Sequence, residues 1–353
     1  MVMLFHLAFA TWAIARSDVG RITAGAVDFP ALAPISWFGW VGVEIFFVLS
    51  GIVICLSAQG ATASGFARSR IVRLYPAAWV CGTLTLAVLL ILGQGDLPAR
   101  YARTMLLFPT GPWVAVVYWT LAHEMAFYGL IFLLLLVGKF RYLPHLLSGL
   151  GAASTAFLVL LALNQRSGLD PTFHSLLQMG QSVPATFVLS FGCFFALGGF
   201  IYLCVRQECT AWRLAMIVLC AGGSLLRIVW RTDRMSETTH LSLEPAVPAA
   251  IFAVAVLLMA ASLIWHEPIT RRFGDRAAGL REIGLATYPL YLLHAPLGAA
   301  ILLGLRHAGV DQEIALGAAV AAVVTLAFLV SLFIERPIQS RLRRVLTRGA
   351  APD

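Results

Sequence analysis

The chain has 353 residues, of which 60% are hydrophobic and only 12% are charged. Soluble domains carry about 25% charged residues, so this composition excludes an ordinary soluble enzyme and indicates a polytopic membrane protein. The formal net charge is +8. In a membrane protein such an excess follows from basic loops on the cytoplasmic side, so the expected partner is the lipid bilayer and not nucleic acid.

Apolar segments recur along the whole chain and predict an all-α transmembrane bundle of about ten helices. The first segment is short, because at about 1.5 Å per residue it reaches only ~22 Å of a hydrocarbon core of ~30 Å. We therefore expect the natural start to lie upstream of Met1. The predicted spans are 1–15, 37–58, 74–93, 118–137, 144–163, 183–205, 212–230, 245–265, 283–305 and 313–334.

No polar stretch is long enough for a separate soluble domain, so we predict one membrane domain, residues 1–335, and a basic cytoplasmic tail, residues 336–353. With the N-terminus in the cytoplasm, most of the 25 Lys and Arg residues fall on the cytoplasmic side. This bias places both termini in the cytoplasm of a multi-pass protein of the inner (plasma) membrane.

Six cysteines are spread along the chain, and none belongs to a CxxC pair. We expect them to be reduced, apolar core residues. Cys204 and Cys209 are close in sequence but lack further ligand residues nearby, so we predict no metal site.

Ionisable residues occur inside several predicted membrane helices, where a charge is costly and therefore indicates function. His6 lies in the first helix, Glu44 in the second and His294 in the ninth. Glu44 has a structural alternative, which is to pair with a cation and fix packing. His294 lies between Pro289 and Pro296, which break the helical hydrogen bonding. It is either a ligand or a hinge residue.

The fourth predicted helix carries a polar row. Thr120, Glu124 and Tyr128 are spaced four residues apart, so they share one face, and Trp119 lies on the adjacent stripe. A hydroxyl, a carboxylate and a phenol in one row can hold a hydroxylated substrate or orient a base.

A basic segment, 66–76, runs from the connection after the second predicted helix into the start of the third, and it contains Arg68, Arg70 and Arg73 but no acid. We predict a cytoplasmic loop that binds either anionic lipid headgroups or a phosphate-bearing ligand.

Together these segments, in this order, resemble the integral-membrane acyltransferase 3 family over nearly the whole chain. Glu44 stands where the family more often has aspartate, and no SGNH-type domain follows the last helix. The motifs that carry the resemblance are Leu-Phe-His6, Gly-Val-Glu44-Ile-Phe-Phe-Val-Leu-Ser-Gly51, Arg68-Ser-Arg70 with Arg73-Leu-Tyr-Pro76, Trp119-Thr-Leu-Ala-His-Glu124-Met-Ala-Phe-Tyr128, Thr287-Tyr-Pro-Leu-Tyr291-Leu-Leu-His294 and Glu335-Arg336-Pro337.

The resemblance implies a single-domain O-acyltransferase that moves an acyl group, usually acetyl, from cytoplasmic acyl-CoA to a hydroxyl of a sugar in an exopolysaccharide, O-antigen or related glycan. Acyl-CoA would be a co-substrate, and no cofactor is expected. The implied roles are catalysis by His6, Glu44 and Glu124, donor binding by Arg68, Arg70 and Arg73, and substrate binding by Trp119, Thr120, Tyr128, Tyr291 and His294.

A second class of protein is compatible with the same residues. A proton-coupled secondary transporter or flippase of a glycan or small molecule also needs ionisable side chains and broken helices inside the membrane. It accounts less simply for the basic segment. In the acyltransferase interpretation, the outer loops 94–117, 164–182 and 231–244 are expected to help select the acceptor.

Overall fold

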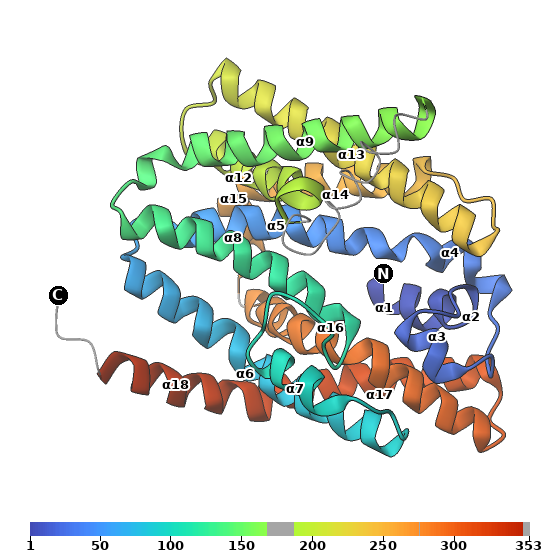
Figure 1. Ribbon diagram of the computed structural model, residues 1–353. Helices are drawn as coiled ribbons and strands as arrows, with labels where there is room; N and C mark the ends of the chain where they lie inside the picture. The colour runs from blue at the N-terminus through green and yellow to red at the C-terminus, as the bar shows by residue number, and fades with distance from the viewer. Residues whose placement is uncertain (168–186, 275, 349–353) are drawn as a thin grey trace. The chain divides into compact units, whose positions relative to one another are not determined.

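The computed structural model describes residues 1–167, 187–274 and 276–348. Within these residues nine helical stretches are long and apolar enough to cross a membrane, and a shorter apolar helix, Val2–Ala13, opens the chain (Figure 1). This confirms the predicted all-α, polytopic fold of about ten helices. The predicted loop 164–182 falls mostly outside the described residues.

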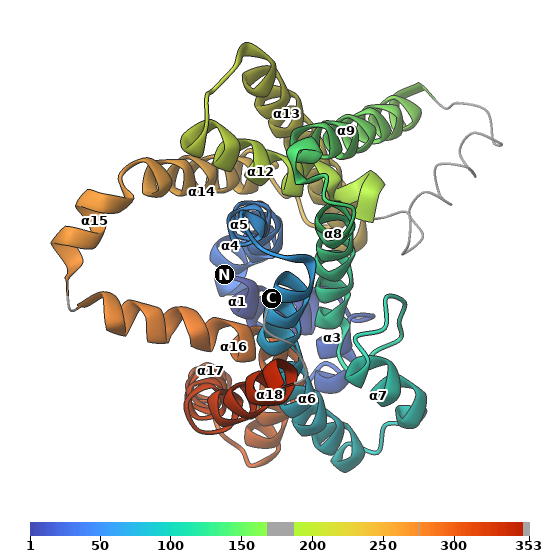
Figure 2. The same cartoon turned by 90° about the vertical axis from the view of Figure 1, so that its left-hand side faces the viewer.

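The chain forms two compact units. Unit 1 comprises Met1–Trp40, Ala67–Ala122 and Arg272–Asp353. In it α16 packs against α17, and α6 contacts α18 through Arg68 and α16 through Arg73 (Figure 2). Its elements are α1 (Val2–Leu4), η1 (Phe5–Ala10), α2 (Thr11–Ala13), α3 (Asp18–Thr23), η2 (Pro30–Leu32), α4 (Ala33–Ser36), η3 (Trp37–Trp40), most of α6 (Ala63–Ile91), α7 (Leu97–Met105), η4 (Val116–Tyr118), the start of α8 (Trp119–Leu136), α16 (Arg276–His307), α17 (Gln312–Leu329), η7 (Val330–Glu335) and α18 (Arg336–Arg348).

Unit 2 comprises Val41–Phe66 and His123–Arg271. Its central contact is between α5 and α12, which meet where glycines allow the backbones to approach. A Cβ added at Gly198 would lie 2.0 Å from the carbonyl oxygen of Val48, so no side chain fits there. Its further elements are α5 (Val41–Ala58), the rest of α8, η5 (Phe140–Tyr142), α9 (Leu143–Ser167), η6 (Phe187–Phe191), α12 (Gly192–Arg206), α13 (Ala211–Thr239), α14 (Ala246–Ile264) and α15 (His266–Phe273).

The basic segment is helical, so its prediction as a loop was wrong. Helix α6 begins at Ala63 and carries Arg68, Arg70 and Arg73 in its first turns. The Thr62 hydroxyl accepts a hydrogen bond from the Gly65 N–H at 3.1 Å, which caps the helix. Arginine, leucine and alanine are good helix formers, and no proline intervenes before Pro76.

Prolines interrupt the last helices less than predicted. Helix α16 runs unbroken from Arg276 to His307 with Pro289 and Pro296 inside it. In lipid the backbone groups must bond internally, which favours keeping the helix. Pro337 also lies inside a continuous helical stretch, because α17, η7 and α18 follow one another without a break from Gln312 to Arg348.

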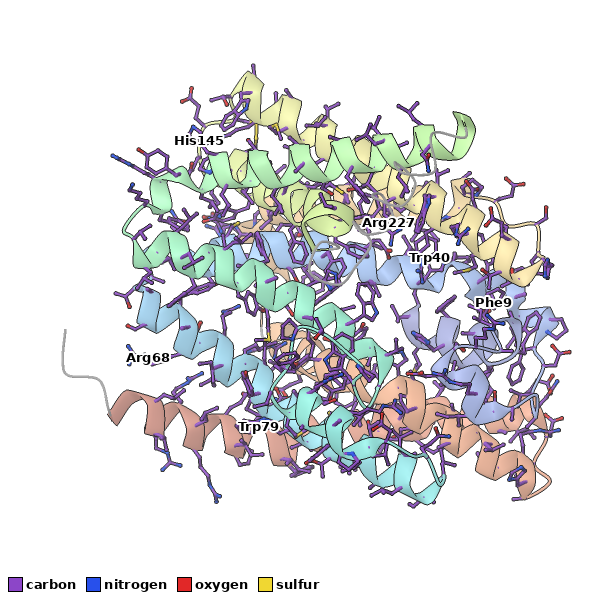
Figure 3. All side chains as sticks on the ribbon, in the orientation of Figure 1. Phe9, Trp40, Arg68, Trp79, His145 and Arg227 are labelled. Atoms are coloured by element: carbon purple, nitrogen blue, oxygen red, sulfur yellow. A yellow bond between two sulfur atoms is a disulfide. The ribbon has the colours of Figure 1, made fainter. Side chains whose placement is uncertain are left out.

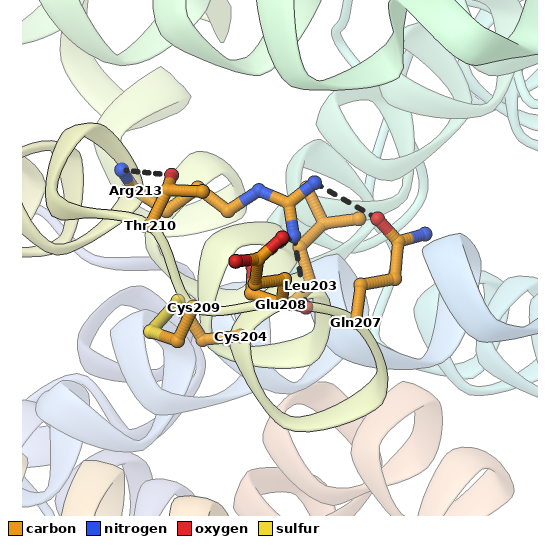
Figure 4. The surroundings of a disulfide bond; sticks show 7 residues. All are labelled: Leu203, Cys204, Gln207, Glu208, Cys209, Thr210 and Arg213. Atoms are coloured by element: carbon orange, nitrogen blue, oxygen red, sulfur yellow. Dashed lines mark hydrogen bonds between the residues drawn. A yellow bond between two sulfur atoms is a disulfide. The ribbon is translucent and has the colours of Figure 1, made fainter.

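The cysteine prediction holds for four residues and is wrong for two. Cys55, Cys81, Cys193 and Cys220 are buried free thiols. Cys204 and Cys209 form a disulfide across the turn between α12 and α13 (Figure 4). Arg213 closes this turn by donating to the carbonyls of Glu208, at 2.7 Å, and Leu203, at 3.3 Å. The tight turn brings the two sulfurs together, which sequence spacing alone did not indicate.

Candidate functional site

Two histidines meet in unit 1. His6 lies in the π-helix η1, an irregular helix type that often marks functional sites. Its ring lies 5.1 Å, centroid to centroid, from the ring of His294 in α16. His294 is 1% exposed. The predicted catalytic histidine and the predicted substrate-binding histidine are therefore neighbours, although 288 positions separate them in the sequence.

The hydrogen bonds of His294 define its tautomer. Its Nδ1 lies 2.7 Å from the carbonyl oxygen of Tyr291 and 3.3 Å from that of Leu290. A carbonyl only accepts, so Nδ1 carries the proton and donates it. The lone pair is then on Nε2, which is buried without a hydrogen-bond partner among the described residues. His294 thus presents a fixed acceptor nitrogen inside the unit.

Tyr291 and Thr120 extend this cluster. The Thr120 hydroxyl donates to the Tyr291 oxygen at 3.0 Å, and the Tyr291 hydroxyl donates to the Val117 carbonyl at 3.3 Å. The Tyr291 ring lies 5.7 Å from the His294 ring. Trp119, the residue before Thr120, is half-buried at the start of α8. Four predicted site residues, His6, Thr120, Tyr291 and His294, are therefore linked within unit 1.

The three arginines of the basic segment lie near the N-terminal end of α6, where Figure 3 labels Arg68, and they have different surroundings. Arg68 donates to the Leu346 carbonyl at 3.5 Å, and Arg70 donates to the Ser69 hydroxyl at 3.2 Å. Residues two apart on a helix do not face each other, so Arg68 and Arg70 point in different directions. Arg73 is drawn inward, with its guanidinium 5.4 Å from the centre of the Tyr288 ring and 4.0 Å from the Glu335 carboxylate.

The predicted carboxylates both belong to unit 2. Glu124 accepts a hydrogen bond from the Tyr128 hydroxyl at 2.6 Å and one from Ser50 at 3.3 Å. The contact with Tyr128 confirms that these two residues share a helical face. Both hydrogen bonds end on the same carboxylate oxygen, and the side chain of Glu124 is buried. Hydroxyl donors to a carboxylate stabilise its charged form.

Glu44 has cationic neighbours that the sequence reasoning missed as site residues. It is 3% exposed, and its electrostatic partners are Arg231 and Arg227 of α13. The Arg227 guanidinium lies 5.0 Å from the Phe191 ring and 4.4 Å from the Trp230 ring, in the interior of the unit (Figure 3). The signal was present: Arg227 is a charged residue inside a predicted apolar span, the same criterion that selected Glu44.

The fold and these clusters define a polytopic membrane protein with ionisable side chains held inside its helices. Residues 1–336 match the family model described as an acyltransferase domain. The match covers nearly the whole chain, so the protein belongs to the acyltransferase 3 family and is a membrane acyltransferase. No match is found among curated proteins or among solved structures.

Proposed function

We propose that this protein transfers an acyl group, acetyl in the first instance, from cytoplasmic acyl-CoA to a hydroxyl of a sugar in a cell-envelope or secreted glycan. The observation that carries the proposal is the His6–His294 pair, 5.1 Å apart in unit 1. Two imidazoles inside a membrane helix cluster supply the base that hydroxyl acylation needs. The family match supports acyl transfer and gives no support to the alternative of a transporter.

In the proposed reaction His6 removes the proton of the acceptor hydroxyl. The hydroxyl oxygen attacks the thioester carbon, a C–O bond forms, and the C–S bond breaks. The proton then passes from the imidazolium to the departing CoA thiolate, so the enzyme returns to its starting state. His294 lies beside His6, and its Nδ1–H is committed to the Tyr291 carbonyl. We assign it, with Tyr291, Thr120 and Trp119, to substrate positioning.

The binding site for the acyl-CoA donor is proposed at the N-terminal end of α6. Guanidiniums bind phosphates through paired hydrogen bonds, and Arg68 and Arg70 are only partly buried. Arg73 contacts Glu335 and Tyr288 and holds α6 against the last helices. The basic residues of these segments support the proposal that this end, and both termini, lie in the cytoplasm.

The carboxylates are proposed as catalytic groups on chemical grounds. Acyl transfer through a histidine passes through an imidazolium, which a carboxylate stabilises. Glu124 accepts hydrogen bonds from Tyr128 and Ser50, and Glu44 has Arg231 and Arg227 as electrostatic partners. Their roles are tested by Glu124→Gln and Glu44→Gln, each of which should lower the turnover number while leaving the affinity for acyl-CoA unchanged.

The first experiment measures base-labile acyl groups on cell-envelope and secreted glycans. A deletion strain is complemented with the intact gene, with His6→Ala, or with His307→Ala, an exposed histidine at the end of α16. We expect the acyl groups to return with the intact gene and with His307→Ala, and to be reduced at least ~100-fold with His6→Ala, the usual loss on removing a general base. Equal acylation in all strains, with equal protein in the membrane, would overturn the proposal.

A further inference from the structure

A cavity of about 520 Å³ opens in unit 1, away from Arg68, Arg70 and Arg73 of α6. Its walls come from α3, the last turns of α6, the start of α7, the loop before η4 and α16. Sites for small ligands occupy ~300–1,000 Å³, so this cavity has the size of a binding site. The polar side chains that line it are Asp18, Arg21, Gln94, Asp96 and Arg100, and Trp113 supplies an aromatic wall.

Hydrogen bonds fix one side of the cavity. Arg100 donates to the carbonyls of Trp113, at 2.9 Å, and Val114, at 3.4 Å. Asp18 pairs with Arg21 and accepts a hydrogen bond from the Val116 N–H at 3.0 Å. The Trp113 indole donates to the Phe108 carbonyl at 2.9 Å. The loop that carries Trp113 is therefore held in place before any ligand arrives, which lowers the entropy cost of binding.

The other side of the cavity offers uncommitted polar groups. Asp96 stands at the N-cap of α7 but makes no capping hydrogen bond with its side chain. Its carboxylate is exposed and free to accept hydrogen bonds from a ligand. Gln94, two residues earlier, is also exposed and brings both a donor and an acceptor. A carboxylate next to an amide is suited to a ligand with several hydroxyl groups.

The walls of the cavity connect directly to the histidine cluster. Val116 begins η4, and the next residue, Val117, accepts the hydrogen bond from Tyr291. Pro296, which lines the cavity, lies two residues beyond His294 in α16. On the other side, Ser17 precedes α3 and donates to the Ala10 carbonyl, at the end of the helix that carries His6.

The cavity and the basic segment with Arg68 and Arg70 lie at opposite ends of α6. Leu89 lines the cavity, and the rise from Arg68 to Leu89 is about 30 Å at 1.5 Å per residue. This length matches the hydrocarbon thickness of a bilayer. A ligand that enters the cavity therefore comes from the membrane face opposite to the one that the arginines occupy.

We propose that this cavity binds the acyl acceptor as a neutral sugar ring with free hydroxyl groups, an assignment that rests on the proposed acyltransferase function. Two carboxylates and two guanidiniums line it, so its charges balance. An anionic sugar would meet Asp18 and Asp96, and a cationic one would meet Arg21 and Arg100. Hydroxyl groups pair with both kinds of side chain, and Trp113 covers the apolar part of a ring.

The test uses the intact chain in lipid nanodiscs. The probes are neutral methyl glycosides of glucose, galactose, mannose, rhamnose and N-acetylglucosamine, with the uronate of glucose and propan-1-ol for comparison. Hydrogen exchange without donor reports binding, and we expect at least one neutral glycoside to protect residues 94–100 and 112–116. The uronate and propan-1-ol should protect neither segment.

With acetyl-CoA present, the release of free CoA reports transfer to the same glycosides. Asp96→Asn and Gln94→Ala should each raise the KM for the sugar about tenfold, the effect of one lost hydrogen bond to a charged or amide group, with kcat nearly unchanged. Asp28→Asn removes an exposed carboxylate elsewhere in unit 1 and should leave the KM unchanged.

The two proposals fail separately. Transfer to a neutral glycoside without protection of the two segments, and with an unchanged KM in Asp96→Asn and Gln94→Ala, would overturn the cavity assignment and leave the acyltransferase function standing. Protection of both segments by a neutral glycoside, lost in Asp96→Asn but without any CoA release, would support the cavity and overturn the proposed function. No protection and no release with any probe would overturn both.

Discussion

The two units hold their ionisable side chains in different ways. In unit 1 His294, Tyr291 and Thr120 hydrogen-bond to backbone carbonyls, and Thr120 also donates to Tyr291, next to an open cavity. In unit 2 Glu44 and Arg227 are enclosed by helices that meet at glycines and by aromatic rings. The polar cluster of unit 1 therefore lies beside a cavity that a ligand can enter. In unit 2 the charged side chains are instead enclosed by closely packed helices.

Breaking the packing of unit 2 should have the largest effect. In Gly198→Ala the new Cβ would lie 2.0 Å from the Val48 carbonyl oxygen, a backbone atom that cannot move alone. The helices α5 and α12 would have to separate, and we expect a loss of about 3 kcal/mol or more in the free energy of unfolding. Thermal unfolding of the purified protein in detergent measures it.

Gly149→Ala in α9 is the matched control. Its Cβ would meet open space, so this change should be neutral or stabilise the protein by up to ~1 kcal/mol. Equal unfolding temperatures for Gly198→Ala and the unchanged protein would show that the contact of α5 with α12 does not limit stability.

Removing one charge of unit 2 should have the next largest effect. Arg227 is 8% exposed, and Glu44 is one of its electrostatic partners. Arg227→Met leaves the buried Glu44 carboxylate with Arg231 as its remaining cationic partner, so it should lower the free energy of unfolding by ~2–3 kcal/mol. The double variant Arg227→Met with Glu44→Gln removes both charges and should recover part of this loss.

Arg234→Met serves as the control for this cycle. Arg234 lies on the same helix, is largely exposed and pairs with Glu237 on the surface, so its loss should change stability by less than ~0.5–1 kcal/mol. A double variant no more stable than Arg227→Met alone would mean that Glu44 and Arg227 are not energetically coupled.

Much of this comparison could be predicted from the sequence, because apolar length and intramembrane charge are local signals. They predicted the helices and selected His6, Glu44, Glu124 and His294 as candidate site residues. The helical state of the segment around Arg68 was missed, since a basic, polar stretch was assigned to a loop although Thr62 caps a helix there. The meeting of His6 with His294, and the cavity near Asp96, depend on contacts between distant segments that no local pattern encodes.

The Cys204–Cys209 disulfide lies at one end of unit 2. The pair lies at the end of α12, where Tyr202 hydrogen-bonds to Gln59, shortly before the arginines of α6. In the orientation that we propose, this end faces the cytoplasm, where disulfides are rare. If the donor arginines face the cytoplasm, Cys204 and Cys209 are thiols in the cell, and the bond forms only on oxidation.

Mass spectrometry after rapid acid quenching and alkylation measures whether Cys204 and Cys209 are thiols or a disulfide in the cell. The four buried cysteines serve as internal thiol references. Alkylated Cys204 and Cys209, and unchanged stability of Cys204→Ser, would support cytoplasmic entry of acyl-CoA. A bond that persists in quenched cells would place this end on the oxidising face. The arginines of α6 would then lie on that face as well, and cytoplasmic acyl-CoA could not be their ligand.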